Sequence, residues 1–297
     1  MKFKTLATAI AAATVSTATL AGGSAMADGH MGAPEFKISG DVTVGYFKDG
    51  TGDYTFGSNG SEVIFDASQK VGGITYFGSM TANIADSKIG EGDISTDDLY
   101  VGFKGAFGEV RMGDTDNGCD AVDTGWVADD VFISHDSGGC AAGDQNNVTY
   151  KGSRGPVSYA IGYSPDVGSG DGATTAGEDT VSVGIAGKVG PATVSLGHEV
   201  AGDDSNTVLG VSGSFGPVAV GIRASKFEDN DTNVGYTAQY AARGNKFYVG
   251  IGDVDDNDTL FLGYNRSIGS NTTFIAEYVD NDANSDQQYA IGLKHAF

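Results

Sequence analysis

Apolar and polar residues alternate along most of the chain, and this period of two is the feature that most constrains its fold. Between Phe36 and Tyr46, for example, isoleucine and valine alternate with lysine, serine, aspartate and threonine. Such alternation over about ten residues is typical of a β-strand with one apolar and one polar face. The pattern recurs up to the last residue, Phe297, and its occurrences predict sixteen strands. We therefore expect an all-β protein.

The connections between the predicted strands alternate in length. One set is short and contains glycine and proline, as in Gly190-Pro191 and Gly216-Pro217, which are typical of tight hairpin turns. The other set is longer, polar and mostly acidic; its first member is 49–60 and its longest is 115–144. Seven short turns and eight longer loops make the fifteen connections that sixteen strands require. Short turns at one end and long loops at the other indicate an outer-membrane β-barrel.

The two faces of the predicted strands differ in charge. The apolar face carries no Asp, Glu, Lys or Arg, whereas the polar face holds many charged residues. A soluble β-sandwich would bury its apolar faces together and turn its polar faces to water. The uncharged face instead favours a barrel with lipid outside and a polar lumen. The charged residues expected to face the lumen are Lys37, Asp41, Asp66, Lys104, Glu109, Arg111, Lys151, Lys188, Glu199, Arg223, Glu277 and Lys294.

The N-terminus predicts export. Two lysines precede an apolar stretch at 6–20, and an A-x-A sequence of the kind that signal peptidase cleaves ends at Ala27. We therefore expect residues 1–27 to be removed as a signal peptide. Residues 28–297 are then expected to fold as a single barrel domain beyond the cytoplasm.

Charge and motifs exclude several classes of protein. The chain has 17 Lys+Arg against 39 Asp+Glu, a formal net charge of −22, so we expect no nucleic-acid partner. Past the signal peptide no apolar stretch approaches the roughly 20 residues of a membrane-spanning helix. The sequence contains no G-x-S-x-G, H-E-x-x-H or P-loop motif. We therefore expect no enzyme and no catalytic residue.

Several ordered features resemble general diffusion porins of the Gram-negative outer membrane. They are the signal peptide, an opening strand at 36–40, the Gly-Pro turns, a glycine-rich strand end at 107–114 followed by a strand at 147–150, and the terminal Phe297. The resemblance implies a sixteen-stranded, trimeric barrel in the outer membrane, with a water-filled channel for passive diffusion of small hydrophilic solutes and ions. It also implies contact with outer-membrane lipid and lipopolysaccharide, and recognition of Phe297 by the barrel-assembly machinery.

The resemblance further implies that the third loop folds into the lumen and narrows it. In this chain that loop is about 115–144, contains no Lys or Arg, and is expected to present acids to one side of the constriction. These acids are Asp114, Asp116, Asp120, Asp123, Asp129, Asp130 and Asp136. The basic residues expected on the facing wall are Lys37, Lys104, Arg111, Arg223 and Lys294.

Opposite charges across a constriction orient polar solutes, and the gap sets a size limit. A surplus of carboxylates in a pore raises the local cation concentration. We therefore expect weak cation selectivity. The wall has fewer arginines than the usual cluster of this family, which leaves its handling of anions open.

The loops suggest two further features. Cys119 and Cys140 both fall in the predicted constriction loop and, in an oxidising compartment, are expected to form a disulfide. The acidic stretch 253–258 could take calcium, but it lacks the glycine and the distal glutamate of an EF-hand loop. We expect no required cofactor, and no metal ligand can be named from the sequence.

Two alternatives to a general porin stay open. One is a substrate-selective channel of the same architecture. A row of inward aromatic residues or a sugar-specific lumen would mark such a channel, and the only aromatic residues expected to point inward are Phe47, Phe77 and Phe227. The other is a secreted acidic β protein that binds calcium.

Overall fold

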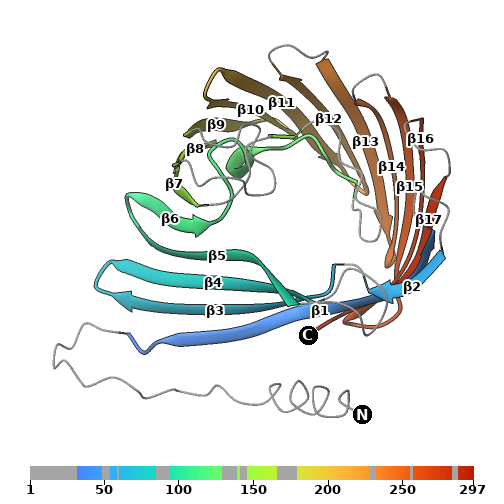
Figure 1. The fold of residues 1–297 in the computed structure, drawn as a ribbon, viewed down its shortest axis with the longest axis horizontal. Helices are drawn as coiled ribbons and strands as arrows, with labels where there is room; N and C mark the ends of the chain where they lie inside the picture. Colours follow the sequence, from blue (N-terminus) through green and yellow to red (C-terminus); the bar gives the residue numbers. More distant parts are fainter. Residues whose placement is uncertain are drawn as a thin grey trace.

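The computed structural model shows a closed antiparallel β-sheet that curls into a barrel (Figure 1). The structure describes residues 32–48, 54–58, 60–84, 94–128, 139–140, 146–165, 179–227, 232–254, 257–282 and 287–297. The predicted signal peptide, residues 1–27, lies outside these ranges. No helix among the described residues is both long and apolar enough to cross a membrane.

Seventeen strands and one short 3₁₀ helix make up the described regular structure. The strands are β1 (Glu35–Lys48), β2 (Tyr54–Ser58), β3 (Glu62–Val71), β4 (Ile74–Ile84), β5 (Ile94–Gly105), β6 (Gly108–Asp114), β7 (Asn147–Arg154), β8 (Val157–Ser164), β9 (Thr180–Val189), β10 (Ala192–Ala201), β11 (Asp204–Phe215), β12 (Val218–Phe227), β13 (Thr232–Ala242), β14 (Asn245–Val254), β15 (Asn257–Ser267), β16 (Thr272–Asn281) and β17 (Gln288–Ala296). The helix is η1 (Asp120–Val122).

Pairing between the first and last strands closes the barrel. From β3 to β17 each strand pairs antiparallel with the next, and β17 pairs with β1 over Asp41–Lys48. Beyond β17, the Phe297 N–H donates to the Gly40 carbonyl at 2.9 Å, and the Gly40 N–H donates back to Phe297 at 3.3 Å. A closed sheet satisfies its backbone hydrogen bonds internally, as the apolar interior of a membrane requires.

The barrel has sixteen strand positions because β2 and β3 share one of them. β1 pairs with β3 through Glu35–Asp41 and with β2 through Val44–Lys48. The expected fold class, a sixteen-stranded antiparallel barrel, is therefore confirmed. The assignment of 49–60 to a loop is wrong in part, since β2 lies within it. Its five residues offer too short an alternation to stand out in the sequence.

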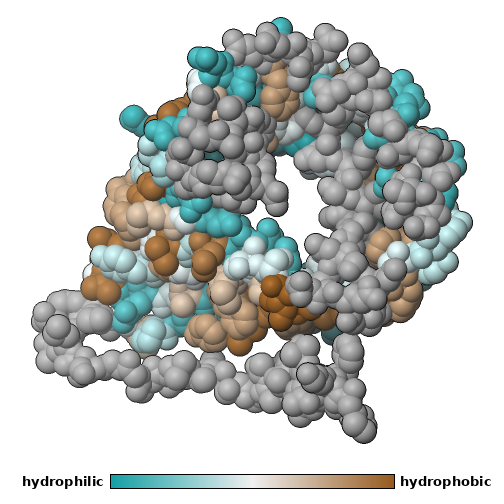
Figure 2. All heavy atoms as spheres, viewed as in Figure 1, coloured by the Kyte–Doolittle hydropathy of each residue, from teal (hydrophilic) through white to brown (hydrophobic). Residues whose placement is uncertain are grey.

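The side-chain faces follow the predicted alternation. Large apolar residues are exposed on the outer face of nearly every strand, whereas buried Thr43, Thr149, Ser182 and Glu199 face inward. The polar-in, apolar-out arrangement expected from the sequence is confirmed. Figure 2 shows the hollow that this ring of strands encloses.

Part of the inner face is apolar, which the sequence analysis did not anticipate. Tyr248, Phe261, Ile275, Val279 and Ala290 form a buried cluster on β14–β17. Phe47 and Ala128 pack against this cluster. The barrel interior therefore contains a small hydrophobic core beside its polar wall.

Candidate functional site

The segment that follows β6 lies against the inner wall of the barrel. Figure 1 shows this segment and η1 inside the ring of strands. Its backbone donates hydrogen bonds to inward side chains: Gly118 N–H to Ser182 Oγ at 2.7 Å, and Val127 N–H to Thr237 Oγ1 at 3.0 Å. Between them the Thr124 N–H donates to Ser195 Oγ at 3.2 Å. The wall therefore supplies acceptors to backbone donors that would otherwise be unpaired.

A row of inward glycines makes room for this segment. A methyl group on Gly210 would lie within 3.0 Å of the Thr124 carbonyl, and one on Gly197 within 3.0 Å of Cys119 Sγ. Cβ atoms essentially never come that close to other atoms, so any side chain here would displace the segment. The row crosses five consecutive strands, β8–β12, and consists of Gly162, Gly184, Gly197, Gly210 and Gly221. We call it the glycine track.

Arg223 fixes the middle of the segment to β12. Its Nη1 lies 2.9 Å from Asp123 Oδ2, and its side chain is only 4% exposed. The guanidinium also lies over the Trp126 ring, 5.4 Å from the ring centre. The sequence analysis placed Arg223 and Asp123 on opposite sides of a constriction. The structure instead brings them into direct contact beneath the segment.

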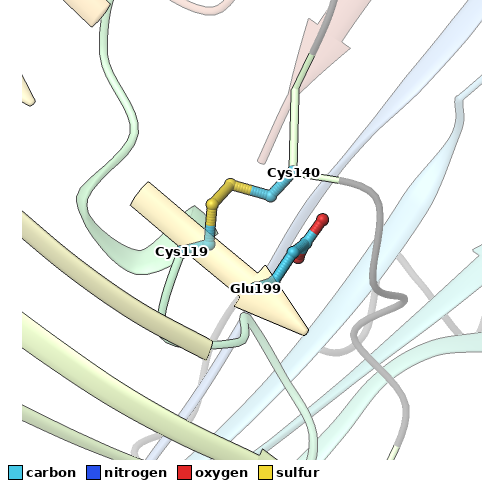
Figure 3. Close-up of side chains that lie close together, drawn as sticks. All are labelled: Cys119, Cys140 and Glu199. Carbon is cyan, nitrogen blue, oxygen red and sulfur yellow. A yellow bond between two sulfur atoms is a disulfide. The ribbon is translucent and has the colours of Figure 1, made fainter. Parts of the chain in front are cut away.

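A disulfide joins the segment to the returning part of the same loop. Cys119 and Cys140 are bonded, with 6.0 Å between their Cα atoms (Figure 3). Beside them the Asn206 side-chain N–H donates to the Gly139 carbonyl and to Glu199 Oε1, both at 3.0 Å. The predicted disulfide is confirmed.

The disulfide also bears on metal binding. The one group of three adjacent candidate metal ligands in the described part of the chain is Cys119, Cys140 and Glu199. Metal binding by cysteine requires thiolates. Since both sulfur atoms are bonded to each other, this group does not fit a metal.

Two other predicted acids also hold the loop in place. Asp116 lies 2.6 Å from Lys151 Nζ, and its backbone carbonyl accepts a hydrogen bond from Thr149 Oγ1 at 2.8 Å. Asp120 Oδ2 accepts from Asn117 Nδ2 at 2.8 Å. Asp114 ends β6, opposite Leu99 on β5. The remaining predicted acids, Asp129, Asp130 and Asp136, lie outside the described residues.

The predicted basic residues divide into two groups. Lys294 pairs with Asp41 at 2.9 Å, as Arg223 does with Asp123. Lys37, Lys104 and Arg111 line one cavity over β1 and β3–β6, where Arg111 is paired with Glu109 at 2.6 Å. Lys151 and Trp126 also anchor the segment, which the sequence did not predict. Lys151 was predicted only as an inward charge, and Trp126, the single tryptophan, was given no role.

The sequence matches a family of known proteins. A family model described as Gram-negative porin matches residues 7–297. The chain belongs to the Gram-negative porin family. No curated protein sequence matches it.

Solved porin structures are similar to this porin over most of its length. OmpT of Vibrio cholerae in its trimer form is 17% identical, with a TM-score of 0.70, covering 90% of this chain and 100% of its own. A porin refined at 1.8 Å is 22% identical, with a TM-score of 0.65, covering 89% and 100%. The anion-selective porin from Comamonas acidovorans is 19% identical, with a TM-score of 0.63 and the same coverage.

Family and fold together establish what the barrel does. This porin is a multi-pass β-barrel of the outer membrane, and it forms a channel for passive diffusion. Its described loop segment and the cations of the facing wall are the features that can shape this channel.

Proposed function

We propose that this porin is weakly cation-selective. The supporting observation is that four inward cations lie within 2.9 Å of a carboxylate: Arg111, Lys151, Arg223 and Lys294. Pairing cancels most of the field that each cation would exert on a passing ion. The chain as a whole carries a formal charge of −22, so the remaining surplus is acidic. Such a surplus concentrates cations and excludes anions.

The reversal potential in a planar bilayer under a KCl gradient tests this proposal. We expect a value between zero and the potassium equilibrium potential. Lys104→Gln should move it further toward potassium, because this removes an inward cation. Lys226→Gln, on the outward face of β12, is the matched control and should leave it unchanged. A reversal potential on the chloride side would contradict the proposal.

We also propose that three copies of this porin assemble, as in the trimer form of OmpT. The same bilayer recording provides the test, because each insertion of a trimer should close in three equal conductance steps. Insertions that close in a single step would contradict the assembly without affecting the selectivity.

We further propose that the channel has no catalytic role, in keeping with its family. Calcium at the acidic loops, contacts with lipopolysaccharide, and recognition of Phe297 by the assembly machinery stay predictions. Asp255 and Asp256, within the acidic stretch considered for calcium, lie outside the described residues.

A further inference from the structure

A cavity of about 640 Å³ lies on the inner wall, between β1 and β3–β6. This volume is in the range of pockets that hold small organic molecules, about 300–1,000 Å³. Three cations line it, Lys37, Lys104 and Arg111, and so do three carboxylates, Glu35, Asp66 and Glu109, together with the aromatic residues Phe77 and Tyr100. Glu109 is paired with Arg111, and Asp66 accepts a hydrogen bond from Ser79. The cavity therefore places Lys37 and Lys104 beside aromatic surface inside the channel.

The Phe77 ring packs against the barrel wall at Gly102. Phe77 on β4 pairs with Gly102 on β5, and a methyl group on Gly102 would fall 2.6 Å from the ring. Only glycine leaves room for the ring to lie against the backbone there. The Tyr100 ring meets it edge-on, with 6.3 Å between centres. Phe77 is thereby held between Gly102 and Tyr100, and it lines the cavity.

The cations lie over these rings and keep donors for a ligand. Lys104 Nζ is 5.2 Å from the centre of the Phe77 ring, and the Arg111 guanidinium is 4.8 Å from that of Tyr100. Arg111 is oriented by Glu109, to which its Nε donates at 2.6 Å. Within the described residues this is its one hydrogen bond, and neither Lys37 nor Lys104 has an ion-pair partner there. Lys37 and Lys104 thus differ from Lys151, Arg223 and Lys294, whereas Arg111 is paired through its Nε and keeps its Nη donors.

We propose that this cavity is an affinity site for small aromatic carboxylates that pass through the channel. The ring of the solute packs on Phe77 in place of the Lys104 ammonium, and its carboxylate accepts hydrogen bonds from Lys104 and Arg111. The flexible stem of Lys104 lets its ammonium move from the ring to the carboxylate. Charge-assisted hydrogen bonds of this kind are among the strongest that a protein makes. The site rests on the open channel and is independent of its overall selectivity.

Blocking of single-channel current in a planar bilayer tests the site, with 3-phenylpropionate as the probe. We expect brief interruptions of the current, whose frequency rises with concentration until the site is saturated. Propionate lacks the ring and phenethylamine lacks the carboxylate, so neither should cause them. Interruptions of equal length with propionate or phenethylamine would overturn the proposal. Phenylalanine binding more tightly than 3-phenylpropionate would also overturn it, in favour of a site for zwitterions.

Variants locate the site. Lys104→Gln and Arg111→Gln should each shorten the interruptions about tenfold, the effect of losing one charged hydrogen bond. Phe77→Leu should remove the preference for the ring. Lys188→Gln is the matched control, because it removes an exposed inward lysine on β9, away from the cavity. An equal effect of Lys188→Gln would overturn the assignment. Normal conductance without interruptions would overturn the site alone, whereas a bilayer without any conductance would overturn the channel.

Discussion

Gly210→Ala should release the segment around Thr124 from the inner wall while leaving the barrel closed. The added methyl group would overlap the Thr124 carbonyl, and backbone cannot rotate away as a side chain can. Overpacking of this kind costs about 1–3 kcal/mol. We expect this free energy to be lost from the attachment of the segment to the wall. The pairing of β11 should persist, because a β-strand of the barrel readily accommodates alanine.

Amide hydrogen exchange and unitary conductance measure this effect. The amides of Gly118, Thr124 and Val127 should exchange about tenfold faster, since their acceptors lie on the wall. The open-channel current should become larger and noisier. Gly213→Ala is the control, because a methyl group on this glycine of the same strand would meet its neighbours at 3.4 Å, an ordinary contact. Exchange and current like those of the unchanged protein would show that the glycine track does not seat the segment.

Arg223→Ala should weaken the same attachment through charge. It leaves the carboxylate of Asp123, whose side chain is 17% exposed, without its cation, and it removes the guanidinium from over the Trp126 ring. Loss of one partner from a buried, hydrogen-bonded charge pair costs about 2 kcal/mol or more. We expect a noisier open channel and faster exchange at Thr124 and Val127. The change in reversal potential should be small, because this cation is already paired.

A double-mutant cycle separates this anchoring role from a simple loss of lumen charge. Asp123→Ala alone should have nearly the same effect on current noise as Arg223→Ala, and the double variant should add little. Lys188→Ala removes an inward cation on β9 and should leave the noise unchanged. If Arg223→Ala shifts only the reversal potential, and does so as much as Lys188→Ala, then Arg223 is a pore-lining charge.

The strands could be predicted from the sequence because each one faces two different environments. Apolar residues face lipid and polar residues face the lumen, so the two alternate along each strand. This alternation can be recognised without knowing which strands pair with each other. β2 was missed because its five residues, one of them Gly57, carry too little of this pattern. The inner cluster around Phe261 and Ile275 was missed for a different reason. Its residues stand at polar-face positions, where apolar side chains were not expected.

The roles of individual charges were less predictable than the strands. Arg223 and Asp123 are 100 positions apart, and only the folded loop shows that they meet. The sequence alone was equally consistent with these two residues on opposite sides of the channel. The glycine track could not be predicted either. From sequence alone, a glycine in a strand indicates only a weak strand former, and its role becomes clear once the structure places another backbone against it. The disulfide could be predicted because the chain has only two cysteines.

The central claim, passive diffusion of small hydrophilic solutes through an open barrel, is tested most directly by liposome swelling. Folded protein would be reconstituted into liposomes, which would then be diluted into isotonic solutions of sugars of increasing size. The account predicts swelling that is fast with the smallest sugar, slows steadily as the sugar grows, and does not saturate with sugar concentration. Liposomes that contain folded barrels yet swell no faster than protein-free liposomes would contradict it.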